Sequence, residues 1–354
     1  MDQPQDLDTL ALATAEGLAR RHVGVAVAVV ADGRAAYAAA GTTGSADGGS
    51  PGADTLFEIG SVTKTFTALS LARMAVAGTV ELDEPLARLL PEATSVPSRG
   101  GQEITLRHLA THTSGLPRLP KGMMPRALLR PRTPDPYAGC TAEVLLSGLA
   151  RTRLRSTPGR RVRYSNLGAG LLGLALARRA GTTYEQLVAT QVCAPLGLSA
   201  TGVTAGVTGP GRLAQGHDSR RRPSPPWNLA DLAGAGGLRS SARDLVSYVR
   251  AQWECAGPDE QAEAIRLTRQ VEHRDNRFSW MHLGWRAHRL HPRQGAHLQI
   301  WHNGGTGGFA SFVGFDPESG TAVIILSNTR HPVDAPAFNL LRTLQDRATP
   351  HDAA

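Results

Sequence analysis

The sequence predicts an α+β protein in which an antiparallel sheet is flanked by helices and is built from both ends of the chain. Three observations lead to this prediction. Strand-like runs stand near the N-terminus, they return in the last hundred of the 354 residues, and short helical runs with proline and glycine turns lie between. Strands from both chain ends meet most simply in one sheet, with the all-α region inserted beside it.

The first eighty residues predict a helix, a hairpin and a longer helix. Leucine and alanine recur at helical spacing in residues 8–22. Two strand-like runs follow in residues 23–41, joined by Asp32-Gly33, a strong signal for a two-residue hairpin turn. Residues 57–78 are apolar at spacings of three and four and end near a glycine, which predicts a long, half-buried helix.

The rest of the chain predicts helices first and strands afterwards. Between about residue 80 and 235, β-branched alternation is almost absent, and helices are expected at residues 106–111, 141–150, 169–180, 184–192 and then 241–255. Strands are expected at residues 283–290, 297–302, 309–316 and 321–328, before a closing helix at 336–347. The predicted domains are an α/β sheet domain, residues 1–80 and 256–354, and a helical domain, residues 81–255, with the active site between them.

Composition excludes several classes of protein. With 41% hydrophobic and 19% charged residues the chain is not mainly disordered, and its longest clean apolar run, residues 23–30, is too short to span a bilayer. Of the 38 basic residues only Lys64 and Lys121 are lysines. The arginines are scattered and aromatic residues make up 5%, so a net charge of +8 predicts a solvated surface rather than nucleic-acid binding.

Cysteine and histidine spacing predicts neither a disulfide framework nor a metal site. The three cysteines are far apart, and His108 and His112, one helical turn apart, lack an evident third ligand. The N-terminal residues contain three aspartates and no cationic segment before an apolar stretch. We therefore expect a cytoplasmic protein with no metal, no cofactor and no membrane or nucleic-acid partner.

The first chemical motif is Ser61-Val62-Thr63-Lys64, at the start of a predicted helix. A spacing of three places serine and lysine on one face, so that the ammonium group can reach the hydroxyl. A nucleophilic serine needs a nearby base and positive charge. The same pattern also arises by chance as a capping serine and a surface lysine. Apolar neighbours favour burial here, and an arginine could not exchange protons with the serine.

Two further motifs offer a base and main-chain donors. Tyr164-Ser165-Asn166 precedes an apolar helix, and a phenol, with an ordinary pKa of about 10, becomes a usable base only beside cations. Residues 302–309 read His-Asn-Gly-Gly-Thr-Gly-Gly-Phe after a predicted strand, and consecutive glycines expose N–H groups that can stabilise an oxyanion. Taken singly, Tyr164-Ser165-Asn166 would be the end of a loop before a helix, and residues 302–309 would be a glycine-rich bulge with a surface histidine.

Together and in this order, the three motifs resemble those of the class C β-lactamase and DD-peptidase-like serine hydrolase family, which includes esterases and acyltransferases. The resemblance extends over residues 10–345, because further segments are similar to that family, namely residues 104–117, 158–173, 194–198 and 234–245. The resemblance implies the β-lactamase/transpeptidase fold.

The resemblance also implies a catalytic role for each motif. Ser61 would be the acylated nucleophile, Lys64 its proton-exchanging partner, and Tyr164 the general base and acid. The main-chain N–H groups of Ser61 and Gly305 would form the oxyanion hole.

Four residues would contact the substrate by the same resemblance: Asn166, His302, Asn303 and Gly304. His302 and Asn303 stand where class C β-lactamases carry a lysine and a threonine. A fixed cation for the carboxylate of a β-lactam is thereby lost, and we expect efficient β-lactamase activity to be disfavoured.

These roles predict a serine acyl-enzyme catalyst that moves an acyl group from a small-molecule ester or amide to an amine, an alcohol or water. We expect such a protein to act in small-molecule metabolism such as antibiotic biosynthesis, with residues 118–136 and 220–226 shaping the acceptor pocket. The alternatives are a simple esterase, a β-lactamase, a D-amino-acid peptidase, and a non-enzymatic sensor that retains the pocket.

Overall fold

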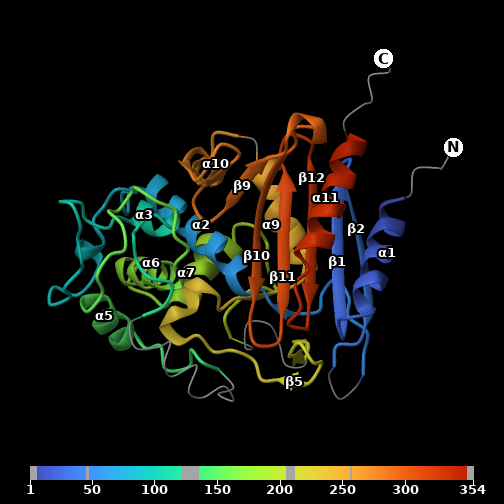
Figure 1. Ribbon diagram of the computed structural model, residues 1–354, viewed down its shortest axis with the longest axis horizontal. Coiled ribbons are helices and arrows are strands. Elements are labelled where there is room, and N and C mark those ends of the chain that lie inside the picture. Colours follow the sequence, from blue (N-terminus) through green and yellow to red (C-terminus); the bar gives the residue numbers. More distant parts are fainter. Residues whose placement is uncertain (1–5, 45–47, 121–134, 205–211, 256, 349–354) are drawn as a thin grey trace.

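The computed structural model describes residues 6–44, 48–120, 135–204, 212–255 and 257–348. An eight-stranded antiparallel sheet stands beside a lobe made mostly of helices (Figure 1). The strand order, β2-β1-β12-β11-β10-β9-β8-β7, places both ends of the chain in one sheet and confirms the predicted fold class. The strands are β1 (Gly24–Ala31), β2 (Arg34–Gly41), β7 (His273–Arg274), β8 (Ser279–Met281), β9 (Arg286–Arg289), β10 (Leu298–Gly305), β11 (Ala310–Asp316) and β12 (Thr321–Ser327).

The hairpin expected near the N-terminus is present. β1 pairs with β2 up to Ala31 and Arg34, and the two residues of the turn, Asp32 and Gly33, have φ angles of 52° and 70°. Both angles lie in the left-handed region that a two-residue hairpin turn of this kind requires. On its other edge β1 pairs with β12, so the N-terminal hairpin is joined directly to the C-terminal strands.

Helices cover both faces of this sheet. α1 (Leu7–Ala19) and α11 (Asp334–Ala348) pack on one face, and α9 (Ala242–Glu254) packs on the other (Figure 1). Along β1, alternate residues beginning at Val25 join the core under α1 and α11, and the residues between them join the core under α9. Burial on both faces explains why β1 is apolar at every position instead of alternating.

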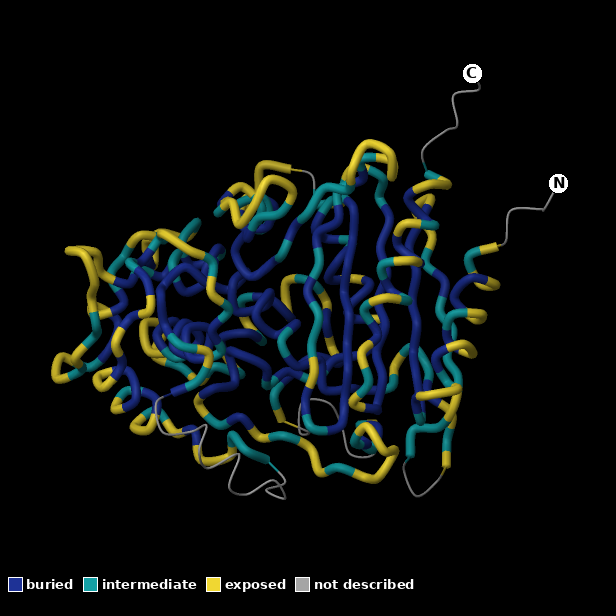
Figure 2. Tube along the Cα trace, in the orientation of Figure 1, coloured by how far each residue is buried: buried dark blue, intermediate teal, exposed yellow. Residues whose placement is uncertain are grey.

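One helix, α2 (Thr63–Val76), connects the sheet side to the helical lobe. Its Phe66 belongs to the sheet-side core and its Leu71 to the core of the lobe. The sequence predicted half burial, but every residue from Thr63 to Ala72 is buried, because packed elements surround the helix (Figure 2). The lobe also contains α3 (Leu106–Ala110), α5 (Ala142–Ala150), α6 (Asn166–Arg179) and α7 (Tyr184–Val188).

Several elements differ from the expectation. The region expected to be all-α contains the two-residue strands β4 (Gly216–His217), β5 (Pro223–Ser224) and β6 (Arg239–Ser240), and β6 pairs with β3 (Phe57–Glu58). Such strands are too short to produce a visible alternation. Helix α10 (Glu260–Gln270) was not expected, and α9, assigned to the helical domain, packs on the sheet. Among the described helices, none is long and apolar enough to cross a membrane.

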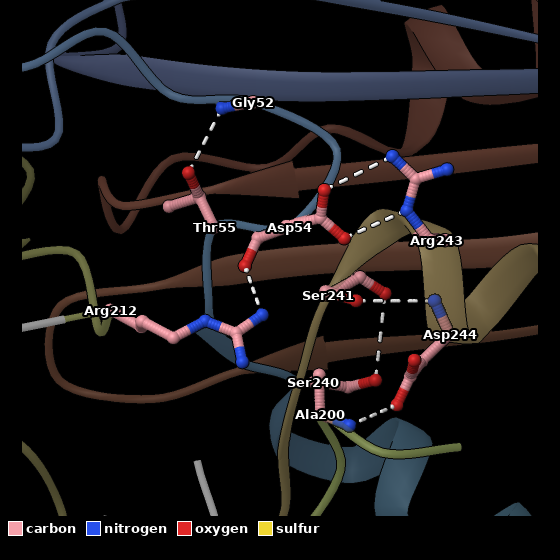
Figure 3. A network of polar contacts seen from close by, with 9 residues as sticks. All are labelled: Gly52, Asp54, Thr55, Ala200, Arg212, Ser240, Ser241, Arg243 and Asp244. Carbon is pink, nitrogen blue, oxygen red and sulfur yellow. Dashed lines mark hydrogen bonds and ion pairs between the residues drawn. The ribbon is translucent and has the colours of Figure 1, made fainter. Parts of the chain in front are cut away.

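The first turn of α9 is anchored by a polar network (Figure 3). Ser241 caps the helix, because its Oγ accepts the backbone N–H of Asp244 at 3.1 Å. The buried carboxylate of Asp244 accepts the backbone N–H of Ala200 at 2.8 Å, and burial raises the pKa of this carboxyl. On the exposed side, Arg243 and Asp54 form an ion pair with an Nε–Oδ1 distance of 2.7 Å. The network fixes the start of α9 against the segment before α2.

Candidate active site

A tight turn presents Ser61 at the junction of the sheet and the helical lobe. The turn, Gly60–Val62, connects β3 to α2, and Ser61 lines a cavity. Gly60 has a φ of 49°, and a Cβ atom there would lie 2.6 Å from the backbone nitrogen of Gly305. Only glycine allows this left-handed conformation together with so close a neighbour. The backbone therefore holds Ser61 against the end of β10.

Lys64 lies beside Ser61, as the spacing of the motif predicted. Its Nζ donates a hydrogen bond to Ser61 Oγ at 2.9 Å and another to the carbonyl oxygen of Ala235. The side chain is 3% exposed. Burial lowers the pKa of the Lys64 ammonium, and the neighbouring Tyr164 partly opposes this shift. A lysine with a lowered pKa can exchange protons more readily than a solvated one.

Tyr164 reaches the same oxygen from the helical lobe. Its hydroxyl oxygen lies 2.6 Å from Ser61 Oγ, and Lys64 Nζ lies 4.8 Å from the centre of its ring. The next residue, Ser165, fixes this position, because its Oγ caps α6 by accepting the N–H of Gly168 and donates to the carbonyl of Pro117. The structure thus brings together the three residues expected to be catalytic.

The glycines of β10 allow its backbone to lie directly on the Ser61 turn. A Cβ atom at Gly304 would lie 2.0 Å from the carbonyl oxygen of Ile59, and Ser311 Oγ on the neighbouring strand donates to that same oxygen at 2.8 Å. Gly304 and Gly305 both line the cavity. This close packing brings the backbone nitrogen of Gly305 to the turn that carries Ser61. That the N–H groups of Ser61 and Gly305 together form an oxyanion hole stays a prediction.

The expected substrate contacts divide into two groups. Asn166 and Asn303 line the cavity, and Asn303 Nδ2 donates to Asp334 Oδ1 at 2.6 Å. Asn166 Oδ1 is buried and has no hydrogen-bond partner among the described residues, so it is free to accept one from a ligand. His302 does not line the cavity. It is 1% exposed, and burial, reinforced by Lys64, lowers its pKa to about 3, so its imidazole is neutral.

The sequence did not reveal most of the cavity wall. The cavity has a volume of about 720 Å³, and beside Tyr164 and Phe309 its lining includes three further aromatic side chains and three arginines, namely Tyr137, Trp227, Trp301, Arg118, Arg286 and Arg330. Within the part of the chain that the structure describes, none of these arginines forms an ion pair. Arg118 begins the loop of residues 118–136 that was expected to shape the pocket, whereas Arg286 lies within an ordinary strand and no local pattern marks it.

Two other expectations concern loops and metals. Arg118 lines the cavity, but most of the expected loop of residues 118–136 lies outside the described residues. Residues 220–226 do not line the cavity, although Trp227, which follows them, does. Among the described residues, no group of three or more histidine, cysteine or acidic side chains could hold a metal ion.

Fold and site together define a serine hydrolase in which Ser61, the expected nucleophile, lies beside a lysine and a tyrosine. The chain belongs to the Beta-lactamase family, whose model matches residues 10–346.

Relatives and solved structures agree with this assignment. A "D-alanyl-D-alanine-carboxypeptidase/endopeptidase AmpH" of Escherichia coli is 29% identical over 88% of this chain and 80% of the relative. A "Beta-lactamase" of Pseudomonas fluorescens is 30% identical over 87% of this chain and 89% of the relative. The crystal structure of a class C β-lactamase from Rhodobacter sphaeroides has the same fold, with a TM-score of 0.79 at 24% identity, and covers 96% of this chain and 99% of that one.

Proposed function

We propose that the protein is a serine acyl-enzyme catalyst that transfers an acyl group from a small ester or amide to an amine, an alcohol or water. The observation that supports it most directly is the contact of Ser61 Oγ with both Lys64 Nζ, at 2.9 Å, and the Tyr164 hydroxyl, at 2.6 Å. Burial lowers the pKa of the Lys64 ammonium, and a serine with a purely structural role gives no reason for a buried lysine beside it.

The proposed reaction has two steps. Lys64, as the free amine that its lowered pKa favours, takes the phenol proton of Tyr164. Ser61 Oγ then forms a bond to the carbonyl carbon of the donor and gives its proton to the resulting Tyr164 phenolate. The N–H groups of Ser61 and Gly305 stabilise the oxyanion, the bond to the leaving group breaks, and the leaving group takes the proton. In the second step water or another acceptor attacks the ester, Tyr164 takes the acceptor's proton, and Ser61 recovers its hydroxyl.

The test of this function is intact-mass spectrometry after mixing with an activated ester. We expect a mass increase equal to one acyl group on the parent protein and none on Ser61→Ala. An adduct that forms and is never released would support the alternative, a sensor that retains the pocket. No adduct with any activated ester or β-lactam would contradict the acyl-enzyme proposal and would favour a sensor that binds without acylation.

We further propose transfer to an amine in cytoplasmic small-molecule metabolism. Bulk water is present at about 55 M, so transfer requires a bound acceptor whose positioning gives it a higher effective molarity. The support is the size of the cavity, about 720 Å³, which has room for a donor and a small acceptor. Ester consumption should accelerate when the right amine is added, and consumption that no amine changes would favour a plain esterase.

A second candidate function, cleavage of a β-lactam or of a peptide ending in a D-amino acid, has its own support. The relatives include a D-alanyl-D-alanine carboxypeptidase and a β-lactamase. Although His302 is neutral, Arg286 lines the cavity and lies 5.8 Å from the ring centre of Trp301, so a cation for a substrate carboxylate is available.

Matched substrates distinguish the two candidates. Arg286→Gln should lower kcat/KM about tenfold or more for an ester with a carboxylate, and for penicillin if penicillin is a substrate, because it removes a charge-assisted contact. A neutral ester of the same length should be little affected, and the exposed Arg274→Gln is the control variant. Equal losses for both esters would exclude a carboxylate contact at Arg286, and rapid penicillin hydrolysis by the parent would favour the second candidate.

A further inference from the structure

His112 contacts three consecutive residues centred on Tyr164. Its carbonyl oxygen accepts the backbone N–H of Arg163 at 2.7 Å, and its Nδ1 accepts the backbone N–H of Ser165 at 3.3 Å. Between these two contacts, the imidazole packs on the Tyr164 ring with 4.5 Å between ring centres. One residue thus holds the chain on both sides of the tyrosine and supports its side chain.

The conformation and burial of His112 carry a cost that stability alone does not explain. Its φ angle is 57°, in the left-handed region that side-chain-bearing residues seldom adopt, and the residue is 1% exposed. Because Nδ1 is an acceptor, the proton of the neutral ring is on Nε2, and this buried atom has no partner among the described residues. An unpaired buried donor costs about 1–3 kcal/mol, a cost that an apolar side chain would avoid.

The charge state of His112 is compatible with its acceptor role. Burial lowers its pKa well below 6.5, and Lys64, His302 and Arg286 lower it further in that order. The imidazole therefore stays neutral beside the Lys64 ammonium, and Nδ1 keeps the lone pair that accepts the Ser165 N–H.

We propose that His112 is a positioning residue, which keeps the Tyr164 hydroxyl within hydrogen-bonding distance of Ser61 Oγ by accepting the Ser165 N–H and packing on the tyrosine ring. The inference rests on the proposed function, since it assigns His112 a part in the step that Tyr164 performs. His112 does not line the cavity, so we expect its effect to pass through Tyr164, on which it packs. A displacement of about 1 Å in such a contact can lower a rate by a hundredfold.

Two substitutions separate positioning from simple packing. His112→Phe keeps a ring on Tyr164 and fills the space but leaves the Ser165 N–H without an acceptor. His112→Asn tolerates the left-handed conformation and places an amide oxygen near the position of Nδ1. We expect the acylation rate with an activated ester to fall at least tenfold in His112→Phe with KM nearly unchanged, and to recover to within about threefold of the parent in His112→Asn.

His108→Asn is the matched control, because His108 lies four residues earlier, caps α3 through the N–H of Thr105 and does not line the cavity. Thermal unfolding of all variants shows whether a loss of rate follows a loss of stability. A rate in His112→Phe equal to that of the parent, or lower rates in His112→Asn than in His112→Phe, would overturn the proposal. So would a rate loss in His108→Asn as large as that in His112→Phe at equal stability.

A double-mutant cycle tests whether His112 acts through Tyr164. In a Tyr164→Phe background, adding His112→Phe should lower the acylation rate no further, because the hydroxyl being positioned is already absent. A further tenfold loss would overturn the proposal. If the parent itself is not acylated, the proposed function fails together with this inference; if the parent is acylated and His112→Phe is equally fast, only the inference fails.

Discussion

At the scale of single residues, the chemistry converges on one oxygen atom. Ser61 Oγ lies within hydrogen-bonding distance of Lys64, one helical turn later, and of Tyr164, which comes from another part of the chain. Lys64 is almost fully buried, and it also donates a hydrogen bond to a backbone carbonyl. The proposed mechanism assigns Lys64 a proton-exchanging role, which would account for one of the chain's two lysines at this position.

Lys64→Arg tests that explanation. Arginine keeps the positive charge but cannot release a proton near neutral pH, so turnover of an activated ester should fall more than tenfold, about 1.4 kcal/mol of barrier or more. Ser61→Ala, which loses one hydroxyl, should abolish turnover and leave thermal unfolding nearly unchanged. If Lys64→Arg keeps more than a tenth of the parent rate, proton exchange at Lys64 is wrong.

Tyr164→Phe removes one hydroxyl and keeps the ring. We expect the rate constant for acylation to fall about 10²-fold or more, as for removal of a general base. Stopped-flow measurement of acylation, with circular dichroism as a check on folding, gives the comparison. Normal acylation by this variant would mean that the tyrosine is structural and that another group takes the proton from Ser61.

At the scale of secondary-structure elements, the site depends on how closely β10 and α2 approach. Gly304 allows the backbone of β10 to pack on the carbonyl of Ile59, and α2, which begins directly after the turn, places Lys64 beside Ser61. Gly304 has no side chain, and Lys64 does not line the cavity. Backbone packing therefore determines where Ser61 and the expected oxyanion donors lie.

The anchor of α9 provides a prediction at this scale. Asp244→Ala removes the acceptor for the backbone N–H of Ala200 and for the hydroxyl of Thr201, both of which are buried. It should lower the free energy of unfolding by about 1–3 kcal/mol. Asp54→Ala breaks an exposed ion pair and should cost no more than about 1 kcal/mol. Urea denaturation of both variants gives the comparison, and equal losses would contradict the importance of the buried contact.

At the scale of the whole molecule, buried histidines link folding to pH. Burial lowers the pKa of His302 to about 3 and that of His22 to about 4, both from 6.5. Between these folded-state pKa values and pH 6.5, the unfolded chain therefore binds more protons than the folded one. The contribution of these neutral imidazoles to the free energy of unfolding is fully present above pH 6.5. It is lost as the pH falls towards the folded-state pKa values.

His302→Asn measures this linkage. Between about pH 6 and pH 4, the fall in unfolding free energy should be shallower in the variant by about 1.4 kcal/mol per pH unit. Chemical denaturation at a series of pH values gives the slopes, and His291→Asn, at an exposed position, is the control. Parallel curves for parent and His302→Asn would show that His302 does not contribute to the pH dependence of stability.

The sequence by itself determined the fold class, the N-terminal hairpin and the contact between Ser61 and Lys64. These depend on local order, since a period of two, a turn dipeptide or a spacing of three fixes geometry over a few residues. The order of the three motifs also identified the family, which the family model confirms over residues 10–346.

Only the tertiary structure decided the surroundings of the site. In the structure His302 does not line the cavity, whereas Arg286 does. Helix α9 packs on the sheet, and His112 packs on Tyr164. Each of these depends on contacts between segments far apart in the chain, where side-chain direction follows from packing. No local sequence pattern predicts such contacts, because the burial and the charge environment of a residue are properties of the folded molecule and not of any one segment.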